Sequence, residues 1–462
     1  MRPPCDRSWS ESLTGLGFSR SLLGEGGSPH SRADLGEGHV LTSSHHAAHH
    51  ADVVIVGAGV SGLAAAHHLI AAGVTVTVLE AAGDPGGRMA TEQVDGFRLD
   101  RIGQLLNTSY TELERTPGLE DLTLRPFAPG VLVHSDGKQQ RAGALTPARA
   151  LASGSLDQAR LSAALGRLAA LPVDRLLARP ERTAFTALRS RGLPPRTISA
   201  VLRPLLATLL CDPELTTSSR AADLALRTFV RGRLAVPEGG AATLPALLAT
   251  ALPPGTVRTG VRVRSVATNL VTTEEHGDFS CRSAVLATGA RAAAELLPGL
   301  RVPRFHEVTV LHHATAAPVP WDGSLLLDAD PRWPVAHTAV MSAVDPTRAP
   351  AGRSLVSTTV LGPPPPLRTV ASRLARLYDT TTRDWDLLAF HHTPEAVPAM
   401  PPPYDLRRPV RVLAGLYVCG DHRDTNTVQG ALHSARRAAT AVLRDFGIPI
   451  PAPGEPALPV AA

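Results

Sequence analysis

The chain of 462 residues is long enough for about two domains with a large buried core, and 44% of it is hydrophobic. No run approaches about 18 apolar residues, which argues against a transmembrane helix. The four cysteines are scattered without a CxxC pair and favour a cytoplasmic protein with reduced thiols. The net charge of +5 and the 4% of aromatic residues give nucleic-acid binding no support.

Residues 1–50 differ from the rest of the chain. They mix Ser, Gly, Pro, His and balanced charges without a sustained period, so we predict a disordered N-terminal tail rather than a signal peptide. Whether this tail belongs to the mature protein stays open. Its HHAAHH run has no acidic or Cys partner nearby, which favours a solvated segment, and we predict no metal site. Residues 449–462 form a second, Pro-rich tail.

A strand–helix–strand unit opens the folded part. Residues 53–56 are a short apolar run typical of a buried parallel strand, and 62–72 are small and aliphatic, as in a helix packed on a sheet. Residues 74–79 supply the next strand. This order predicts an α/β fold that begins with a Rossmann-like βαβ unit.

Three glycines in G-x-G-x-x-G spacing connect the first strand to the helix. Gly57 permits the tight turn, Gly59 lets the backbone reach a pyrophosphate, and Gly62 allows close helix–strand packing. Glu80 ends the second strand and is placed to accept hydrogen bonds from ribose hydroxyls. The predicted dinucleotide contacts on this side are Gly57, Ala58, Gly59, Ser61, Gly62, Glu80 and Ala81.

Helical and strand-like segments alternate through the middle of the chain. A hairpin is predicted at 130–143 around Asp136-Gly137. Residues 145–235 are expected to be helical and broken at proline, with breaks at Pro172, Pro180, Pro194, Pro204 and Pro213. Further strands are expected at 257–266, 281–288, 306–312, 324–327, 355–360 and 415–419, with Pro-rich connectors at 363–366 and 398–403 and a closing helix at 428–446.

This alternation favours a discontinuous three-layer cofactor domain that carries a split second domain of mixed sheet and helices. The cofactor domain is predicted from 51–125, 236–300 and 405–448, and the substrate domain from 126–235 and 301–404.

Gly86-Gly87-Arg88 distinguishes between the dinucleotides. A glycine pair lets the chain pass close to a cofactor, and Arg88 can neutralise a pyrophosphate; an ordinary glycine loop is the alternative. With Asp95–Asp100, Gly103 and Gln104 after it, this region resembles the FAD-dependent flavin amine oxidase / phytoene desaturase (protoporphyrinogen oxidase-like) superfamily. The resemblance implies FAD as cofactor, contacts from Gly87 and Arg88, and a flavin ring near Gln104.

The C-terminal end is similar to the closing motif of the same superfamily, with Gly415–Asp421 followed by Thr427–Ser434. The resemblance implies that Gly420 and Asp421 hold the ribityl or phosphate region of FAD. A helix N-cap is the alternative role for Asp421. The resemblance also implies that Val428, Gln429 and Ala431 place a helix N-terminus at the pyrimidine edge of the flavin. Cys419 is expected to be a buried small side chain in the strand rather than a covalent flavin attachment.

The middle of the chain matches the superfamily less specifically. Residues 236–240 resemble a Gly-Gly-Met loop in which Ala241 replaces Met, and 261–266 with 287–289 resemble strands that return to the adenosine side. Residues 212–220 resemble a segment of the substrate domain in desaturase-like members of the superfamily. In all, the resemblance covers about 52–446.

The resemblance implies hydride transfer from a substrate C–H to flavin N5, with oxygen or a quinone as electron acceptor. The only lysine, Lys138, follows a turn and is expected in solvent, and aromatic residues are sparse. Both features favour an apolar, polyene-like substrate over an amine. An amine oxidase and a non-catalytic FAD-binding scaffold remain alternatives, and Gln104 is a weak candidate for the reaction site.

Two further features have competing interpretations. The segment 141–233 holds 15 Arg against six Asp and Glu, so it is either a solvated helical surface or a contact with the inner face of a membrane through which a lipophilic substrate enters. Four histidines in the predicted substrate domain could act as acid or base, but packing or surface positions are favoured; they are His312, His313, His391 and His392.

Overall fold

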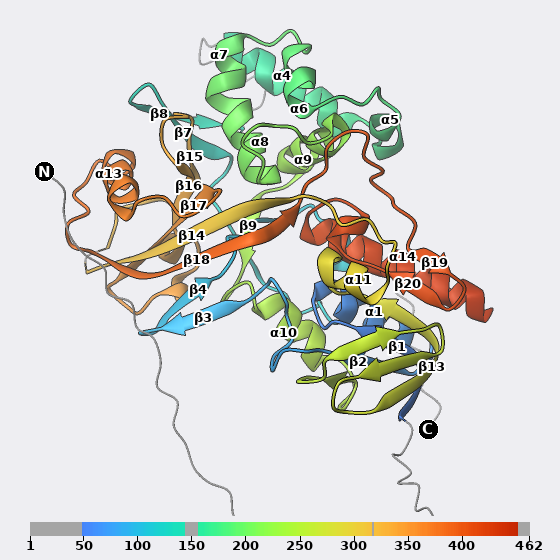
Figure 1. Cartoon of the computed structure of the whole chain (residues 1–462). Coiled ribbons are helices and arrows are strands. Elements are labelled where there is room, and N and C mark those ends of the chain that lie inside the picture. The colour runs from blue at the N-terminus through green and yellow to red at the C-terminus, as the bar shows by residue number, and fades with distance from the viewer. Residues whose placement is uncertain (1–48, 144–155, 317, 451–462) are drawn as a thin grey trace, which may run out of the picture. The chain divides into compact units, whose positions relative to one another are not determined.

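The computed structural model describes residues 49–143, 156–316 and 318–450 (Figure 1). The tail predictions for 1–48 and 451–462 lie outside these residues. The prediction that the tail reaches residue 50 is wrong, because His49 and His50 already belong to the first strand and pair with Phe279 and Ser280. The chain forms two large mixed sheets with helices around them, which confirms the predicted α/β class.

The first sheet contains the N-terminal glycine motif. Its strand order is β10-β2-β1-β13-β12-β11, and β20 also pairs with β13 and with β19. Strand β1 lies parallel to β2 on one side and to β13 on the other, as a βαβ unit requires. The strands are β1 (His49–Val56), β2 (Val76–Leu79), β10 (Val257–Arg258), β11 (Val263–Val266), β12 (Leu270–Thr273), β13 (Asp278–Leu286), β19 (Arg411–Leu413) and β20 (Leu416–Val418).

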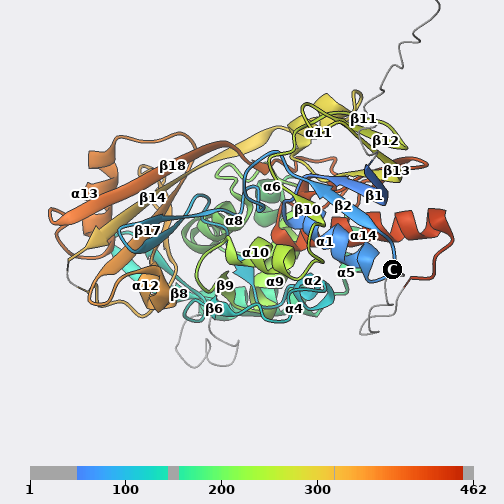
Figure 2. The same ribbon diagram turned by 90° about the horizontal axis from the view of Figure 1, so that it is seen from below.

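Both faces of β1 are covered, which explains its uninterrupted apolar run. Val53 and Ile55 pack with residues of α1 (Val60–Ile70), α10 (Thr243–Thr250) and α14 (Val428–Phe446). Val54 and Val56 pack on the opposite face with residues of β11, β12 and the end of α11 (Ala290–Leu296). In Figure 2, α1 and α10 lie on one side of β1 and β2, and α11, β11 and β12 lie on the other.

The second sheet has the order β18-β14-β17-β16-β15-β7-β8 and is antiparallel except between β15 and β7. The hairpin predicted around Asp136-Gly137 is confirmed as β7–β8. One face of the sheet is covered by α13 (Leu367–Leu377). The strands are β7 (Val131–Ser135), β8 (Lys138–Ala142), β14 (Phe305–Thr315), β15 (Leu326–Asp328), β16 (Val335–Val340), β17 (Ser354–Leu361) and β18 (Trp385–Pro398).

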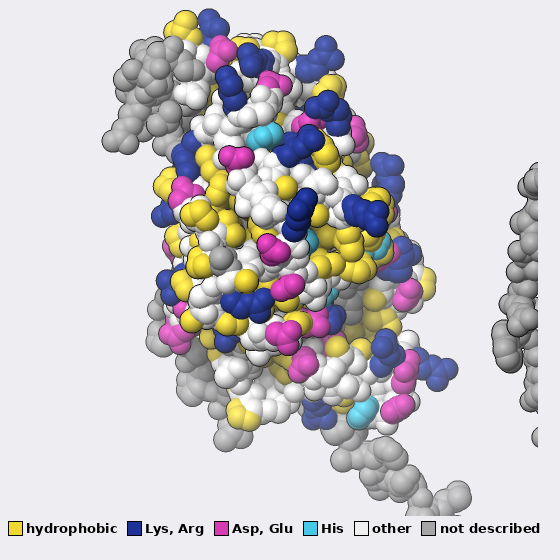
Figure 3. Space-filling model, turned by 90° about the vertical axis from the view of Figure 1, so that its left-hand side faces the viewer, with side chains coloured by type: hydrophobic (Ala, Val, Ile, Leu, Met, Phe, Trp, Pro, Cys, Tyr) yellow, Lys and Arg dark blue, Asp and Glu magenta, His cyan; other side chains and the backbone are white. Residues whose placement is uncertain are grey.

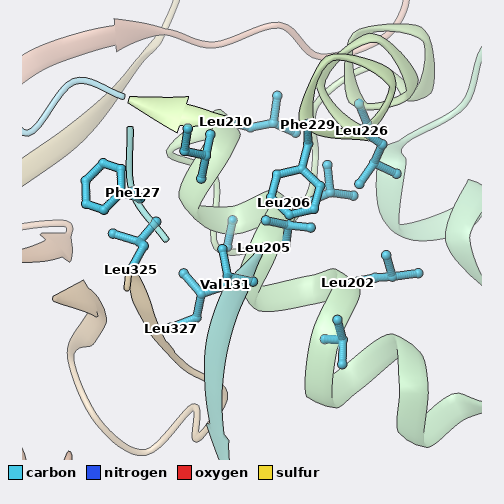
Figure 4. Close-up of a cluster of buried hydrophobic side chains, with 14 of the residues drawn as sticks. Phe127, Val131, Leu202, Leu205, Leu206, Leu210, Leu226, Phe229, Leu325 and Leu327 are labelled. Carbon is cyan, nitrogen blue, oxygen red and sulfur yellow. The ribbon is translucent and has the colours of Figure 1, made fainter. Parts of the chain in front are cut away.

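A group of helices packs against this sheet. Figure 4 shows Leu205 and Leu206 on α8 and Phe229 on α9 facing Val131 and Leu327 of the sheet. These helices are α4 (Leu156–Ala170), α5 (Val173–Leu177), α6 (Ala184–Arg189), α7 (Pro195–Thr197), α8 (Arg203–Leu210) and α9 (Ser219–Arg231).

The predicted helix breaks are confirmed at four of the five prolines, and the break at Pro204 is wrong. A π-helical turn at Ile198–Leu202 leads directly into α8, and Pro204 occupies its first turn. The preceding π-turn changes the local hydrogen-bond pattern and so accommodates the missing N–H of proline. The helical segment therefore continues through the proline.

Two small sheets connect the large ones. One pairs β3 (Thr91–Val94) with β4 (Phe97–Asp100), and the other has the order β5-β9-β6. Asp100 joins a buried cluster in which Arg348 Nη2 lies 2.8 Å from Asp100 Oδ2 and Arg348 Nε lies 3.2 Å from Asp345 Oδ2. The remaining elements used below are β5 (Leu106–Asn107), β6 (Leu124–Pro126), β9 (Leu234–Pro237) and α2 (Thr111–Arg115).

Candidate functional site

The turn between β1 and α1 has the backbone shape expected of its glycines. Gly57 has a φ of +103°, which a residue with a side chain rarely adopts. A Cβ on Gly62 would lie 1.9 Å from the carbonyl oxygen of Gly57, so the helix reaches the turn only because that Cβ is absent. A Cβ on Gly59 would meet nothing within 4 Å. The space in front of Gly59 is therefore open to a ligand.

Glu80 follows β2 and lies beside this turn. Its Oε2 accepts a hydrogen bond of 2.7 Å from the amide of Ala58, and its Oε1 accepts one of 2.9 Å from the amide of Ala82. These two bonds fix the orientation of the carboxylate. Ala58 is fully buried and its amide is committed to Glu80, so its contribution is to hold this side chain.

Arg88 and Asp421 bring the two ends of the chain together. Arg88 follows Gly86 and Gly87, which have φ values of +130° and +60°. Arg88 Nη2 lies 2.7 Å from Asp421 Oδ2, and Nη1 donates to the carbonyl oxygen of Ala396 at 2.7 Å. The side chain of Asp421 is 9% exposed, so the guanidinium offsets the cost of burying the carboxylate.

Helix α14 begins close to this ion pair. The amide of Gly420 donates to Ser434 Oγ at 2.9 Å, and Ser61 Oγ donates to the carbonyl oxygen of Ala431 at 3.2 Å. The second bond joins the first turn of α1 to the first turn of α14. Neither first turn carries an acidic side chain. Both positive helix ends are therefore compatible with a negatively charged ligand.

These elements line a cavity of about 810 Å³, within the range of small-molecule sites. Most of the residues predicted from the sequence line this first cavity. They are Gly57, Gly59, Ser61, Glu80, Ala81, Gly87, Arg88, Gln104, Gly420, Asp421, Val428 and Ala431.

Three predicted residues do not line the first cavity. Ala58 and Gly62 are buried and absent from its lining. Gln429 Oε1 accepts a hydrogen bond of 3.1 Å from the amide of Glu112, and its Nε2 donates to Thr111 Oγ1 at 3.2 Å. The side chain of Gln429 thus anchors the start of α2, and a direct contact between Gln429 and the cofactor stays a prediction.

A second cavity, of about 650 Å³, adjoins the first. Arg88, Gln104, Asp421 and Thr427 line both. The walls of the second cavity are largely apolar. The apolar side chains include Ile102, Leu105, Leu177, Leu209, Leu210, Leu224, Phe229, Leu234, Val308, Val397, Met400 and Leu406.

Two buried carboxylates of the second cavity, Glu112 and Asp424, lie beside arginines. Arg436 binds both oxygens of Glu112, at 2.7 and 2.9 Å. Burial would raise the pKa of Glu112, but the hydrogen bonds and charge of Arg436 hold it below its ordinary value. Asp424 accepts a hydrogen bond of 2.8 Å from His433 Nδ1 and lies 3.3 Å from Arg437.

No role for Asp424 or His433 was predicted from the sequence, although His433 lies within the closing motif Thr427–Ser434. The two residues are only nine positions apart on either side of the start of α14. This short separation was the one sign in the sequence that their side chains could meet.

Four deeply buried polar atoms line the second cavity without a hydrogen-bond partner in the described part of the chain. They are Asn107 Nδ2, Thr208 Oγ1, His337 Nδ1 and Asn426 Oδ1. Burial lowers the pKa of His337 to about 4, so its imidazole is neutral near pH 7. Buried polar groups nearly always find a partner, so these atoms are available to a ligand or to water.

The four histidines considered from the sequence line neither cavity, in agreement with the favoured packing or surface positions. His312 is buried, with Nε2 2.9 Å from the carbonyl oxygen of Asp100, and His313 packs against Trp385. Of the two on β18, His391 is half-buried and His392 is exposed. Lys138 is exposed on the β7–β8 hairpin, as predicted, and lines neither of these cavities.

Comparisons with known proteins agree with this geometry. The family model of flavin containing amine oxidoreductases matches residues 60–443. Putrescine oxidase of Kocuria rosea is 53% identical over 62 residues, which are 13% of this chain and 13% of that protein. Phytoene dehydrogenase of Streptomyces griseus is 56% identical over 48 residues, 10% of each chain. These matches span only a small part of the relatives' lengths.

The fold is also found among solved structures. A protoporphyrinogen oxidase candidate from Exiguobacterium sp. 255-15 superposes with a TM-score of 0.66 at 18% identity, over 86% of this chain and 99% of that chain. The open space at Gly59 and the first cavity, lined from both chain ends, are compatible with a flavin dinucleotide. The chain belongs to the flavin-containing amine oxidoreductase family: it is an oxidoreductase whose cofactor is FAD.

Proposed function

We propose that the chain dehydrogenates an apolar substrate held in the second cavity, at a C–H bond placed where the two cavities meet. The supporting observation is that Arg88, Gln104, Asp421 and Thr427 line both spaces. When bound, FAD supplies a two-electron acceptor that takes a hydride from the substrate C–H bond at N5. Oxygen or a quinone is the proposed final acceptor.

The residues of the first cavity would hold the cofactor. Glu80 would accept hydrogen bonds from ribose hydroxyls, because its carboxylate is already oriented by Ala58 and Ala82. The amides at the start of α1 would bind the pyrophosphate. Arg88 would offset the phosphate charge while it keeps Asp421 paired near the ribityl chain. Val428 and Ala431 would put the positive end of α14 at the flavin.

The lining of the second cavity supports a largely apolar substrate. Among the described residues, Tyr110 and Phe229 are the only Tyr, Trp or Phe in this lining, and neither cavity is lined by a lysine. The described part of the chain shows no ring contact between Tyr110 and Phe229, so the lining gives an aromatic cage for a neutral amine no support. The volume of about 650 Å³ is typical of sites for drug-sized molecules.

Approach of this substrate from a membrane remains a proposal. None of the helices in the described chain is long and apolar enough to cross a bilayer. On the side of the molecule shown in Figure 3, the described basic and acidic side chains are interspersed. A broad basic surface for anionic lipid is not visible there, so any peripheral contact would use another side of the molecule.

An amine is the second candidate substrate. Asn426 Nδ2 donates to the carbonyl oxygen of Pro398 at 3.1 Å, which directs the unpaired Oδ1 to act as an acceptor. A buried acceptor next to Thr427 suits an amine N–H. Putrescine oxidase among the relatives gives this candidate independent support.

Anaerobic bleaching of the flavin absorbance distinguishes these substrates. The FAD-loaded protein would be mixed with acyclic polyenes, with primary and secondary amines, and with NADPH as a control, and followed near 450 nm. We expect bleaching by an apolar polyene-like compound. Bleaching by amines alone would transfer the assignment to amine oxidation, and a flavin that no organic substrate reduces would contradict both.

A further inference from the structure

Helix α9 forms one wall of the second cavity and carries two arginines at its C-terminal end. Ala221, Leu224 and Thr228 line the cavity from one face of the helix, at the spacing of successive turns. Arg227 and Arg231 line the same cavity and are four residues apart. The α9 wall is therefore mainly apolar, with Thr228 as a polar member, and it is basic at one end.

The two arginines lie close enough to affect each other. Residues four apart on a helix are neighbours, and like charges there are mutually destabilising. Burial lowers the pKa of Arg227, and the charge of Arg231 lowers it further. The guanidinium nevertheless stays charged near pH 7, since its ordinary pKa exceeds about 12.

Neither arginine has an acidic partner among the residues that the structure describes. Arg227 is half-buried, and its Nε donates to the carbonyl oxygen of Leu171 at 3.0 Å. That bond anchors the side chain and leaves its two terminal nitrogens without a described partner. Arg231 is exposed and has no hydrogen bond or ion pair to a described residue.

Most other charges of the cavity are paired. Arg88 pairs with Asp421, and Arg436 pairs with Glu112. Arg115 lies 3.4 Å from Glu112, and Arg407 lies 3.9 Å from Asp174. Asp424 lies 3.3 Å from Arg437 and also accepts a hydrogen bond from His433. Glu114, which is exposed on α2, is the remaining unpaired acid in this lining.

We infer that the substrate of this cavity is an amphiphile whose carboxylate is bound by Arg227 and Arg231 while its apolar body extends toward Gln104. The inference rests on the proposed function and specifies its substrate class. The free terminal nitrogens of Arg227 form the edge of a guanidinium that binds a carboxylate through two hydrogen bonds. A bound carboxylate would also relieve the repulsion between the two arginines.

The position of Arg231 in the last turn of α9 offers a simpler explanation for that residue alone, since a cation is favourable at a helix C-terminus. It does not explain Arg227, which lies a full turn earlier and is partly withdrawn from solvent. An isolated cation gains little from partial burial unless a counter-charge is bound. Arg227 is therefore the residue that decides between a solvated helix end and a binding site.

Decanoate, decan-1-ol and decylamine are suitable probes because they share one apolar chain and differ in charge. Their binding to the FAD-loaded protein would be followed by the shift of the flavin absorbance. We expect decanoate to bind at least about tenfold more tightly than the other two. Arg227→Gln and Arg231→Gln should each weaken the binding of decanoate severalfold or more. The affinity for decan-1-ol should stay within about twofold of that of the unaltered protein. Arg167→Gln, at an exposed position on the neighbouring helix α4, is the matched control.

Equal affinities for the three probes, or an unchanged decanoate affinity in both variants, would overturn the anion site and leave the proposed function standing. A protein that binds FAD but whose flavin spectrum responds to none of the probes would contradict the adjoining substrate cavity itself. Arg231→Gln keeps the test decisive if Arg227→Gln does not fold, because Arg231 is exposed.

Discussion

Arg88 and Asp421 are separated by 333 positions in the chain, and their side chains form an ion pair of 2.7 Å at the point where the two cavities meet. The pair links the glycine-rich segment after β2 to the loop before α14. It also puts a positive and a negative group side by side at the proposed cofactor, so neither charge is left uncompensated there.

Removal of the arginine should weaken FAD binding. In Arg88→Met, the largely buried carboxylate of Asp421 has no counter-ion and lies near the phosphates of the cofactor. We expect at least a tenfold higher Kd for FAD, measured by flavin fluorescence on reconstitution. The double variant Arg88→Met/Asp421→Asn should lose less binding free energy for FAD than the sum of the losses in the two single variants, because the two groups are coupled. Strict additivity would contradict the pairing.

Two glycines of the same motif should respond differently to alanine. Gly62→Ala would bring a methyl group within 1.9 Å of a backbone oxygen and should prevent normal folding of the turn. Gly59→Ala meets no protein atom within 4 Å, so the protein should fold with an unchanged circular dichroism spectrum but bind FAD much more weakly. Normal FAD binding by folded Gly59→Ala would show that the cofactor does not approach this turn closely.

The buried cluster around Arg348 should be essential for stability. The Arg348 side chain is 1% exposed and neutralises Asp100 and Asp345, so Arg348→Met leaves two buried carboxylates without a cation. We expect a loss of about 3–5 kcal/mol in the free energy of unfolding, measured by urea denaturation. Arg332→Met, which breaks an ion pair of a highly exposed arginine, is the control and should have no measurable effect.

Stability should decrease as the pH falls from 6.5 toward 4. Burial lowers the pKa of His313 to about 4, from an ordinary value of 6.5. Above pH 6.5 the His313 imidazole is neutral in both the folded and the unfolded chain. Between pH 6.5 and 4 only the unfolded chain takes up the proton, so the folded state loses stability. His312, His337 and His422 act in the same direction, because burial also lowers their pKa values to about 4.

One histidine variant isolates this contribution. His313→Gln should reduce the stability lost between pH 7 and pH 5 by up to about 2 kcal/mol, the linkage expected for one buried histidine. The measurement is urea denaturation at both pH values, with His392→Gln at an exposed position as control. An identical pH dependence in His313→Gln and the unaltered protein would contradict a neutral, buried His313.

The cofactor side of the molecule was largely predictable because its signals are local. The spacing of Gly57, Gly59 and Gly62 specifies one turn, and the position of Glu80 marks the end of the next strand. The structure brings Gly57, Gly59 and Glu80 to a common cavity. Asp421 was predicted from a motif at the other end of the chain, but its pairing with Arg88 was not. Contacts over such a separation leave no periodic signal.

The substrate side was predicted less well. Strand β16 was missed because His and Thr interrupt its apolar residues, and β18 was missed because it mixes His, Thr and charged residues without a clear apolar alternation. β18 is also an edge strand with much of its surface exposed, so its pattern resembles that of a loop. The second cavity combines residues from α2, α9, β14 and the loop before α14, and only the tertiary fold places Arg227, His337 and Asp424 in one lining.

The most direct test is the flavin content of the purified chain after reconstitution, for the unaltered protein and for Gly59→Ala. Absorbance near 450 nm, with protein quantified by amino-acid analysis, would give the FAD-to-protein ratio. We expect about one FAD per chain in the unaltered protein, and a large loss of FAD in Gly59→Ala without a loss of fold. An unaltered protein that folds but cannot be loaded with FAD, or an FAD content unaffected by Gly59→Ala, would contradict the site assigned here.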